Sequence, residues 1–180
     1  DQIGLVAFAG QAATTSPLTT NMKFLGKKIE ELDFNLFEDG TAIGSALSTA
    51  LNRLENSKAK SKVIILLTDG VNNRGEVLPM DAANIAEQRG VKIYTVAVGS
   101  NDEVPFPNKP PYYGRHLRVG LDEELLQKIA EKTGAIYRKA TDSKSLEEIY
   151  QEINRLEKTE IKARIYSYPI ETEYFHWFLY

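Results

Sequence analysis

The run Val63-Ile64-Ile65-Leu66-Leu67 is the feature that most restricts how this chain can fold. Five aliphatic residues in succession leave no polar side to a strand, so we expect a strand formed here to be covered on both faces. That arrangement is typical of a parallel sheet between two layers of helices. Apolar runs at residues 3–8 and 91–98 predict two further buried strands, and residues 135–138 predict a short one.

Helical patterns separate these strands. Apolar residues recur at steps of three and four between Ile43 and Leu54, which predicts an amphipathic helix there. Similar patterns follow residues that suit the start of a helix, namely Asn21, Pro79, Asp122 and either Asp142 or Ser143. Residues 11–20 could pair back on the first strand as a hairpin. The alternation predicts an α/β fold with a doubly wound, mostly parallel sheet and helices on both faces.

The composition excludes several classes of function. The 180 residues contain no cysteine, which rules out disulfides, thiolate zinc sites and a cysteine nucleophile. A net charge of −3 provides no dense basic patch, so we expect no nucleic-acid partner. The chain has no Gly-x-Gly-x-x-Gly fingerprint and no phosphate loop, and the serines of the 43–54 segment have no histidine near them in sequence. We therefore expect no nucleotide cofactor, no catalytic residues and no enzyme activity.

A hydroxyl and a carboxylate are predicted to meet at one edge of the sheet. Thr68-Asp69-Gly70 follows the most apolar strand, and Asp39-Gly40-Thr41 precedes the helix that leads into this strand. Ligands of open α/β sheets bind beyond the carboxyl ends of the strands, and the helix begins at that same end. Hard oxygen ligands suit Mg²⁺, Mn²⁺ or Ca²⁺ rather than zinc. We therefore predict that Thr41 and Asp69 are metal ligands.

Each motif alone has a simpler explanation. A Thr-Asp-Gly sequence after a strand is often only a turn, and Thr41 is an ordinary helix N-cap. The two motifs in this order, separated by an amphipathic helix and a buried strand, are much more specific than either one. The metal hypothesis therefore depends on the pair.

The two motifs and their neighbouring strands resemble von Willebrand factor A domains. The resemblance is carried by the runs Glu38–Leu47, Lys62–Gly70, Ile3–Phe8 and Tyr94–Gly99, and it extends from residue 1 to about residue 156. It looks closest to the membrane-anchored bacterial aerotolerance (Bat) branch. The resemblance implies a Rossmann-like fold and a metal-ion-dependent adhesion site on three loops. Thr41 matches the second of these loops and Asp69 the third.

The first loop of that site, Asp-x-Ser-x-Ser, has no counterpart in the 180 residues. In the family it lies on the first strand, just upstream of where this sequence begins, so we expect a fragment that lacks that strand. We predict that the fragment binds metal weakly or not at all. A missing central strand also leaves flanking backbone groups unpaired. The candidates to fill the gap are the tail segment 161–167, a second copy of the chain, or a rearranged sheet.

The last part of the chain differs from the rest. We expect residues 1–156 to form the domain and residues 157–180 to form a strand and linker, because apolar and polar residues alternate over residues 161–167. The aromatic cluster Tyr174–Tyr180 suits either the interfacial start of a membrane helix or an element packed on the domain. The resemblance implies a protein anchored in a bacterial membrane, with this domain facing the periplasm.

Two classes of function follow from these features. The resemblance implies a metal-dependent protein-interaction module whose ion receives an acidic side chain of a partner, with other Bat proteins and a MoxR-type ATPase as candidate partners. The alternative is a phospho-acceptor domain with Asp69 as the nucleophile, although Val98-Gly99-Ser100 lacks the lysine that such a domain needs. His116, in the proline-rich segment 100–120, is either a partner-recognition residue or part of a solvated loop.

Overall fold

The computed structural model describes residues 1–32, 38–99, 104–105, 116–117 and 121–166. Within these ranges the chain forms both strands and helices. In order, the elements are β1 (Ile3–Phe8), β2 (Ala12–Thr19), α1 (Met22–Glu30), α2 (Ile43–Leu54), β3 (Val63–Thr68), α3 (Pro79–Gln88), β4 (Lys92–Val98), β5 (Val104–Pro105), β6 (His116–Leu117), α4 (Glu123–Lys132), β7 (Tyr137–Ala140) and α5 (Ser143–Tyr166).

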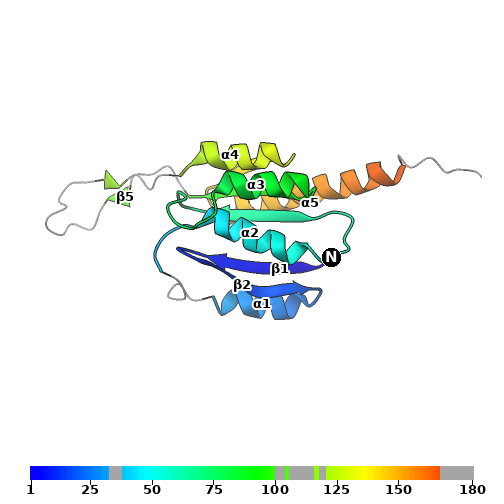
Figure 1. Ribbon diagram of the computed structural model, residues 1–180, viewed down its shortest axis with the longest axis horizontal. Coiled ribbons are helices and arrows are strands. Elements are labelled where there is room, and N and C mark those ends of the chain that lie inside the picture. Colours follow the sequence, from blue (N-terminus) through cyan, green and yellow to red (C-terminus); the bar gives the residue numbers. More distant parts are fainter. Residues whose placement is uncertain (33–37, 100–103, 106–115, 118–120, 167–180) are drawn as a thin grey trace, which may run out of the picture.

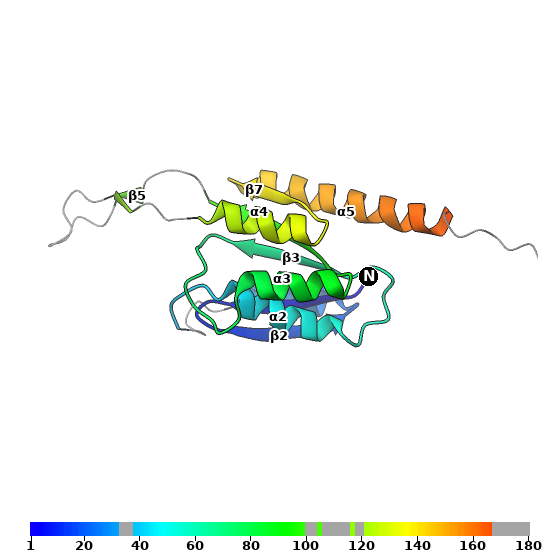
Figure 2. The same ribbon diagram turned by 45° about the horizontal axis from the view of Figure 1, so that its top comes forward.

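A parallel sheet forms the centre of the molecule and confirms the predicted α/β class. Its strand order is β3-β4-β7, and both pairs of strands are parallel. One face packs against α2, α3 and α4, whose apolar side chains form the main core with Ile64, Leu66 and Ile93. The other face packs against α5 through a second core that contains Tyr94, Val96 and Ile149 (Figures 1 and 2). Helices therefore cover both faces of this sheet.

The first two strands form a separate antiparallel hairpin, as the polar pattern of residues 11–20 suggested. β1 pairs with β2, and neither strand belongs to the β3-β4-β7 sheet. Figure 1 shows α1 and α2 on opposite sides of this hairpin, and α2 contacts the hairpin as well as β3. The sheet is therefore interrupted between β1 and β3, which confirms the predicted gap.

One face of β3 is more open than its sequence predicts. Ile64, Leu66 and Thr68 are buried, but Ile65 and Leu67 are 37% and 39% exposed. The register pairs Ile65 with Tyr94 and Leu67 with Val96, which places both side chains on the sheet face that α5 covers. The prediction of a strand covered on both faces is thus wrong here, because α5 packs over β4 and β7 and leaves β3 partly uncovered.

The predicted helix starts are confirmed by their caps. Asn21 accepts a hydrogen bond from the backbone N–H of Phe24 at 3.0 Å, and Asp122 accepts one from Leu125 at 3.0 Å. Pro79 occupies the first turn of α3. Asp142 accepts a bond from the N–H of Ser145 at 2.7 Å at the start of α5. Side-chain oxygens at these positions satisfy N–H groups that have no partner inside the helix.

Two predicted strands near the C-terminus are corrected. Residues 161–166 belong to α5, not to a strand, so the tail strand proposed to fill the gap is wrong. Helix α5 passes through residue 156 without a break, and the domain boundary expected there stays a prediction. The short strand lies at Tyr137–Ala140, two residues later than predicted. The aromatic cluster at 174–180 and residue 167 lie outside the described residues. Among the described residues, no helix is both long and apolar enough to cross a membrane.

Candidate metal site at the carboxyl ends of β1 and β3

The structure brings Thr41 to the turn that follows β3. A Cβ atom added at Gly70 would lie 2.8 Å from Oγ1 of Thr41 and 3.6 Å from its Cβ and Cγ2. The Thr41 hydroxyl is therefore packed against the backbone next to Asp69. Asp69 itself is exposed, directly after the last residue of β3. The Thr41 hydroxyl and the turn that carries Asp69 therefore lie on one rim of the fold. Their role as metal ligands stays a prediction.

The end of β1 joins the same rim. The backbone N–H of Ala42 donates to the carbonyl of Ala9 at 2.7 Å, and the N–H of Gly10 donates to the carbonyl of Glu38 at 2.9 Å. A Cβ at Gly10 would lie 2.8 Å from that same carbonyl oxygen of Glu38, so the loops approach too closely for a side chain. The carboxyl ends of β1 and β3 thus both lie at the N-terminus of α2.

The loop after β3 is fastened to the start of α2. Asn73 Oδ1 accepts a hydrogen bond from the N–H of Thr41 at 2.9 Å, and Asn72 Oδ1 accepts one from the N–H of Ile43 at 2.9 Å. Neither asparagine was predicted from the sequence. The alternative reading of Thr41 as the N-cap concealed them, because the structure places the N-cap of α2 at Ala42, which has no side-chain oxygen with which to cap the helix.

The donor set fits part of a hard-cation site. In the described part of the chain, neither the Thr41 hydroxyl nor the Asp69 carboxylate makes a hydrogen bond or an ion pair with another protein group. Both oxygens are therefore available to a ligand, and both are of the type that Mg²⁺, Mn²⁺ and Ca²⁺ prefer. No group of three or more His, Cys, Asp or Glu side chains with metal-binding geometry occurs among the described residues. The described residues thus contribute an incomplete set of ligands, which water and other groups would complete.

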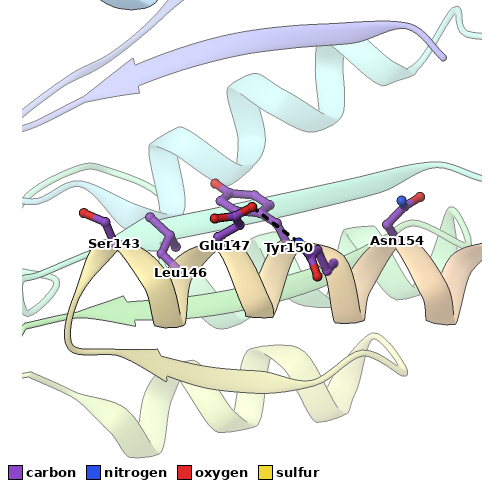
Figure 3. A pocket seen from close by; sticks show the side chains of 6 residues that line it. Ser143, Leu146, Glu147, Tyr150 and Asn154 are labelled. Carbon is purple, nitrogen blue, oxygen red and sulfur yellow. Dashed lines mark hydrogen bonds between the residues drawn. The ribbon is translucent and has the colours of Figure 1, made fainter.

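A second feature is an open hollow on the surface of α5, with a volume of about 440 Å³. Figure 3 shows its lining side chains along one face of the helix, with Gln151 donating to Glu147 at 3.4 Å. The residues that line it are Ser143, Leu146, Glu147, Tyr150, Gln151 and Asn154. All six come from a single helix and include one carboxylate, so the hollow offers no converging set of ligands. The Thr41–Asp69 rim is the better candidate.

Comparison with known proteins agrees with the observed fold. Residues 1–152 match the von Willebrand factor type A domain. The chain therefore belongs to the von Willebrand factor type A family. This membership confirms the expected Rossmann-like α/β fold. The match covers the β1–β2 hairpin, the parallel sheet and the rim that carries Thr41 and Asp69.

Three relatives show the similarity in detail. An uncharacterized protein of Borreliella burgdorferi is 33% identical over 168 residues, which cover 92% of this chain and 49% of that protein. The crystal structure of an aerotolerance-related membrane protein from Bacteroides fragilis matches with a TM-score of 0.71 and 29% identity, over 86% of this chain and 80% of that one. The structure of BatB from Bacteroides thetaiotaomicron matches with a TM-score of 0.72 and 28% identity, over 88% and 80%. The chain spans about half the length of the curated relatives it matches.

Proposed function

We propose that this chain is a divalent-cation-dependent protein-binding module, not an enzyme, and that Thr41 and Asp69 are the metal ligands it contributes. The observation that supports this most directly is the packing of the Thr41 hydroxyl against Gly70, at the end of β3 and next to Asp69. Two oxygen groups from separate loops thereby share one rim of the fold.

The chemistry of the ion explains why two ligands from this chain are useful but not sufficient. Mg²⁺ takes six oxygen ligands in near-octahedral geometry and keeps several waters. A bound ion would supply a positive charge with an exchangeable position, which suits an acidic side chain of a partner protein. Thr41 and Asp69 would hold the ion on the protein side, and Asp69 would bind either directly or through a water. Partner binding would then depend on the divalent cation.

The cellular setting is proposed by analogy with the relatives. The matched Bacteroides fragilis protein is described as an aerotolerance-related membrane protein, and the Bacteroides thetaiotaomicron protein is BatB. We propose the same setting for this chain: a membrane-anchored bacterial protein of the aerotolerance type whose domain faces the periplasm. Other Bat proteins and a MoxR-type ATPase are the partners we propose on the same grounds.

Calorimetric titration of Mg²⁺ and Mn²⁺ into the protein in its natural full length tests the site. We expect binding that Asp69→Ala abolishes and that Thr41→Ala weakens. Asp81→Ala is a matched control, because Asp81 is an exposed aspartate in the first turn of α3. A titration that Asp69→Ala leaves unchanged would remove Asp69 from the site and overturn the proposal.

A phospho-acceptor role for Asp69 is the competing chemistry and has its own test. The protein is incubated with a small phosphodonor and Mg²⁺, and Asp69 is then examined by mass spectrometry. We expect no stable phosphorylation. A phosphorylated Asp69 that is lost in Asp69→Ala would contradict the binding-module proposal.

A further inference from the structure

We propose that Asn72 and Asn73 are positioning residues that hold Thr41 in place for the metal ion. The inference rests on the function proposed above and extends it, because neither asparagine needs to touch the ion. Their side chains fasten the loop after β3, which carries Asp69, to the start of α2, which carries Thr41. The two ligands are thereby fixed relative to each other before any ion binds.

Asn72 replaces a cap that α2 lacks. The first N–H groups of a helix have no partner within the helix, and a Ser, Thr, Asp or Asn at the N-cap usually satisfies one of them. Ala42 occupies that position in α2 and makes no side-chain cap. Asn72 Oδ1 accepts the hydrogen bond from the N–H of Ile43 instead, at 2.9 Å and from a loop 29 residues later in the chain. The start of α2 therefore depends on the position of the β3 loop.

Asn73 is hydrogen-bonded to both polar backbone groups of Thr41, its N–H and its carbonyl. Its Oδ1 accepts the hydrogen bond from the Thr41 N–H at 2.9 Å. The Thr41 carbonyl in turn accepts bonds from the N–H groups of Asn73 at 3.1 Å and Arg74 at 3.3 Å. Both polar backbone groups of Thr41 are thus bonded to residues 73 and 74, so the loop sets where its hydroxyl lies.

Close packing limits any other arrangement of loop and helix. A Cβ at Gly44 would overlap the carbonyl oxygen of Val77, and one at Gly75 would lie 2.7 Å from Ser45 Oγ. Gly75 also has a φ of +96°, a conformation that residues with a side chain rarely adopt. The loop therefore lies directly on the first turn of α2, with glycines at the closest points.

Preorganisation of this kind raises affinity because the ion does not have to order its ligands. Each neutral hydrogen bond contributes about 0.5–1.5 kcal/mol net, which corresponds to roughly twofold to tenfold in an equilibrium constant. We expect Asn73→Ala to lower Mn²⁺ affinity by about fivefold to tenfold, and Asn72→Ala by a similar or smaller factor. Loss of both should lower it further.

The test combines a metal-free measurement with a metal titration. Amide hydrogen exchange of Thr41 and Ile43 is measured without metal in the 180-residue chain, and Mn²⁺ affinity is measured by calorimetry in the protein at its natural full length. The variants are Asn72→Ala, Asn73→Ala, and the aspartate substitutions Asn72→Asp and Asn73→Asp, which keep an accepting oxygen. Asn21→Ala is the matched control, because Asn21 caps α1 with the same kind of bond at 3.0 Å and lies on a different helix.

The outcomes separate this inference from the proposed function. It is supported if the alanine variants exchange Thr41 or Ile43 faster and bind Mn²⁺ more weakly, if aspartate restores slow exchange, and if Asn21→Ala changes neither. Unchanged Mn²⁺ affinity in both alanine variants, while Asp69→Ala abolishes binding, overturns the positioning role and leaves the proposed function intact. Mn²⁺ binding that is insensitive to Asp69→Ala overturns both. If one alanine variant fails to fold, the other still decides the outcome, because Asn72 and Asn73 make separate hydrogen bonds to Ile43 and Thr41.

Discussion

At the scale of single residues, Gly70 determines how closely the β3 turn can approach Thr41. The hydroxyl of Thr41 would lie 2.8 Å from a Cβ at position 70, which is closer than side-chain atoms normally come to a Cβ. Asp69 precedes this glycine, so any shift of the turn moves the carboxylate as well as the hydroxyl. The absence of a side chain at residue 70 is therefore a requirement of the candidate site and not only of the turn.

Gly70→Ala should weaken metal binding more than it affects stability. The added methyl group pushes against the Thr41 hydroxyl, and we expect Mn²⁺ affinity in the natural full-length protein to fall roughly tenfold, equivalent to about 1.4 kcal/mol. The free energy of unfolding should change by less than about 1 kcal/mol, because only the end of one side chain has to give way. Calorimetry and thermal denaturation measure the two effects.

A double-mutant cycle shows whether Gly70→Ala lowers Mn²⁺ affinity through its contact with Thr41. In a Thr41→Ala background the hydroxyl is already absent, so Gly70→Ala should produce little additional loss of affinity. A full tenfold loss in that background would mean that Gly70 acts through some other group. The cycle uses the same two measurements as the single variants.

The sequence predicted Thr41 and Asp69 but not the asparagines beside them. The first two stand in short motifs directly after a strand and before a helix, and topology alone brings such positions to one edge of a sheet. Asn72 and Asn73 act through bonds to residues 29 and 32 positions earlier. A local pattern cannot reveal that the partner of an amide oxygen lies on another element, although an alanine at a helix N-cap indicates that some partner is needed.

At the scale of elements, the contact between α2 and the loop before α3 depends on a glycine within the helix. Glycine is unfavourable by up to about 1 kcal/mol relative to alanine in a helix interior, and Gly44 lies in the first turn of α2, where the cost is smaller. Gly44 is nevertheless required, because a Cβ there would overlap the backbone carbonyl of Val77, which cannot turn aside as a flexible side chain can. Close packing at this point outweighs helix propensity.

Two glycine-to-alanine substitutions should therefore change the free energy of unfolding in opposite directions. Gly44→Ala gains helix propensity but forces the Val77 backbone away, and overpacking typically costs 1–3 kcal/mol or more, so we expect a net destabilisation of about 2 kcal/mol. Gly26→Ala in α1 meets no atom within 4 Å and should stabilise by up to about 1 kcal/mol. Chemical denaturation compares them. A stabilised Gly44→Ala protein would show that the loop can move away at little cost.

Helix α5 is attached to the sheet through Glu157. Its carboxylate accepts hydrogen bonds from Tyr94 Oη at 2.6 Å, Ser61 Oγ at 2.8 Å and Lys92 Nζ at 3.2 Å, and its side chain is only 14% exposed. Burial by itself raises the pKa of Glu157, but these bonds and the charge of Lys92 outweigh it and hold the pKa below the usual value of 4.5. The ionised form is thus favoured in the folded protein.

Because the pKa of Glu157 is lowered in the folded protein, the direction in which stability changes with pH can be predicted. A group whose pKa is lower in the folded state stabilises the protein above its unfolded pKa, here about 4.5, and this contribution is lost as the pH falls through the folded pKa. Glu157→Gln should destabilise the protein by about 1–2 kcal/mol at pH 7, because a charged acceptor is replaced by a neutral one. The difference between the two proteins should shrink below pH 4.5. A difference that stays constant from pH 7 to pH 3.5 in urea denaturation would contradict this role.

The elements that were predicted incorrectly share one cause. Residues 161–167 alternate like a strand, yet α5 continues to Tyr166, because extending an existing helix is easier than starting a new strand that has no neighbour to pair with. The apolar run Val63–Leu67 implied cover on both faces, yet the face shared by Ile65 and Leu67 is partly open. The pattern of apolar residues shows which side chains of a segment can be buried. Whether they are buried depends on elements from elsewhere in the chain that pack against them.

At the scale of the whole molecule, the interruption between β1 and β3 is the main departure from an ordinary α/β sheet. β1 bonds only to β2, and β3 bonds only to β4, so each has an edge whose backbone groups make no ladder with another described strand. Ile65 and Leu67 lie exposed on the open edge strand β3, and Ile3 on β1 is 44% exposed. Unprotected edges with apolar side chains are templates for pairing with another chain.

We therefore expect the 180-residue chain to associate with itself as its concentration rises. Sedimentation velocity over a hundredfold range of concentration should show an increasing sedimentation coefficient. Replacing Ile65 and Leu67 together by threonine places a β-branched residue with good strand propensity at each position but removes apolar surface from the open face, so association should weaken. Leu78→Thr is the matched control, because Leu78 is 64% exposed but lies at the N-cap of α3, where threonine is well tolerated.

If the double variant associates as strongly as the Leu78→Thr protein, the open face of β3 is not the surface that brings the chains together. If neither protein associates at any concentration, the edges of β1 and β3 are protected in solution, and the interruption between them does not create an adhesive surface.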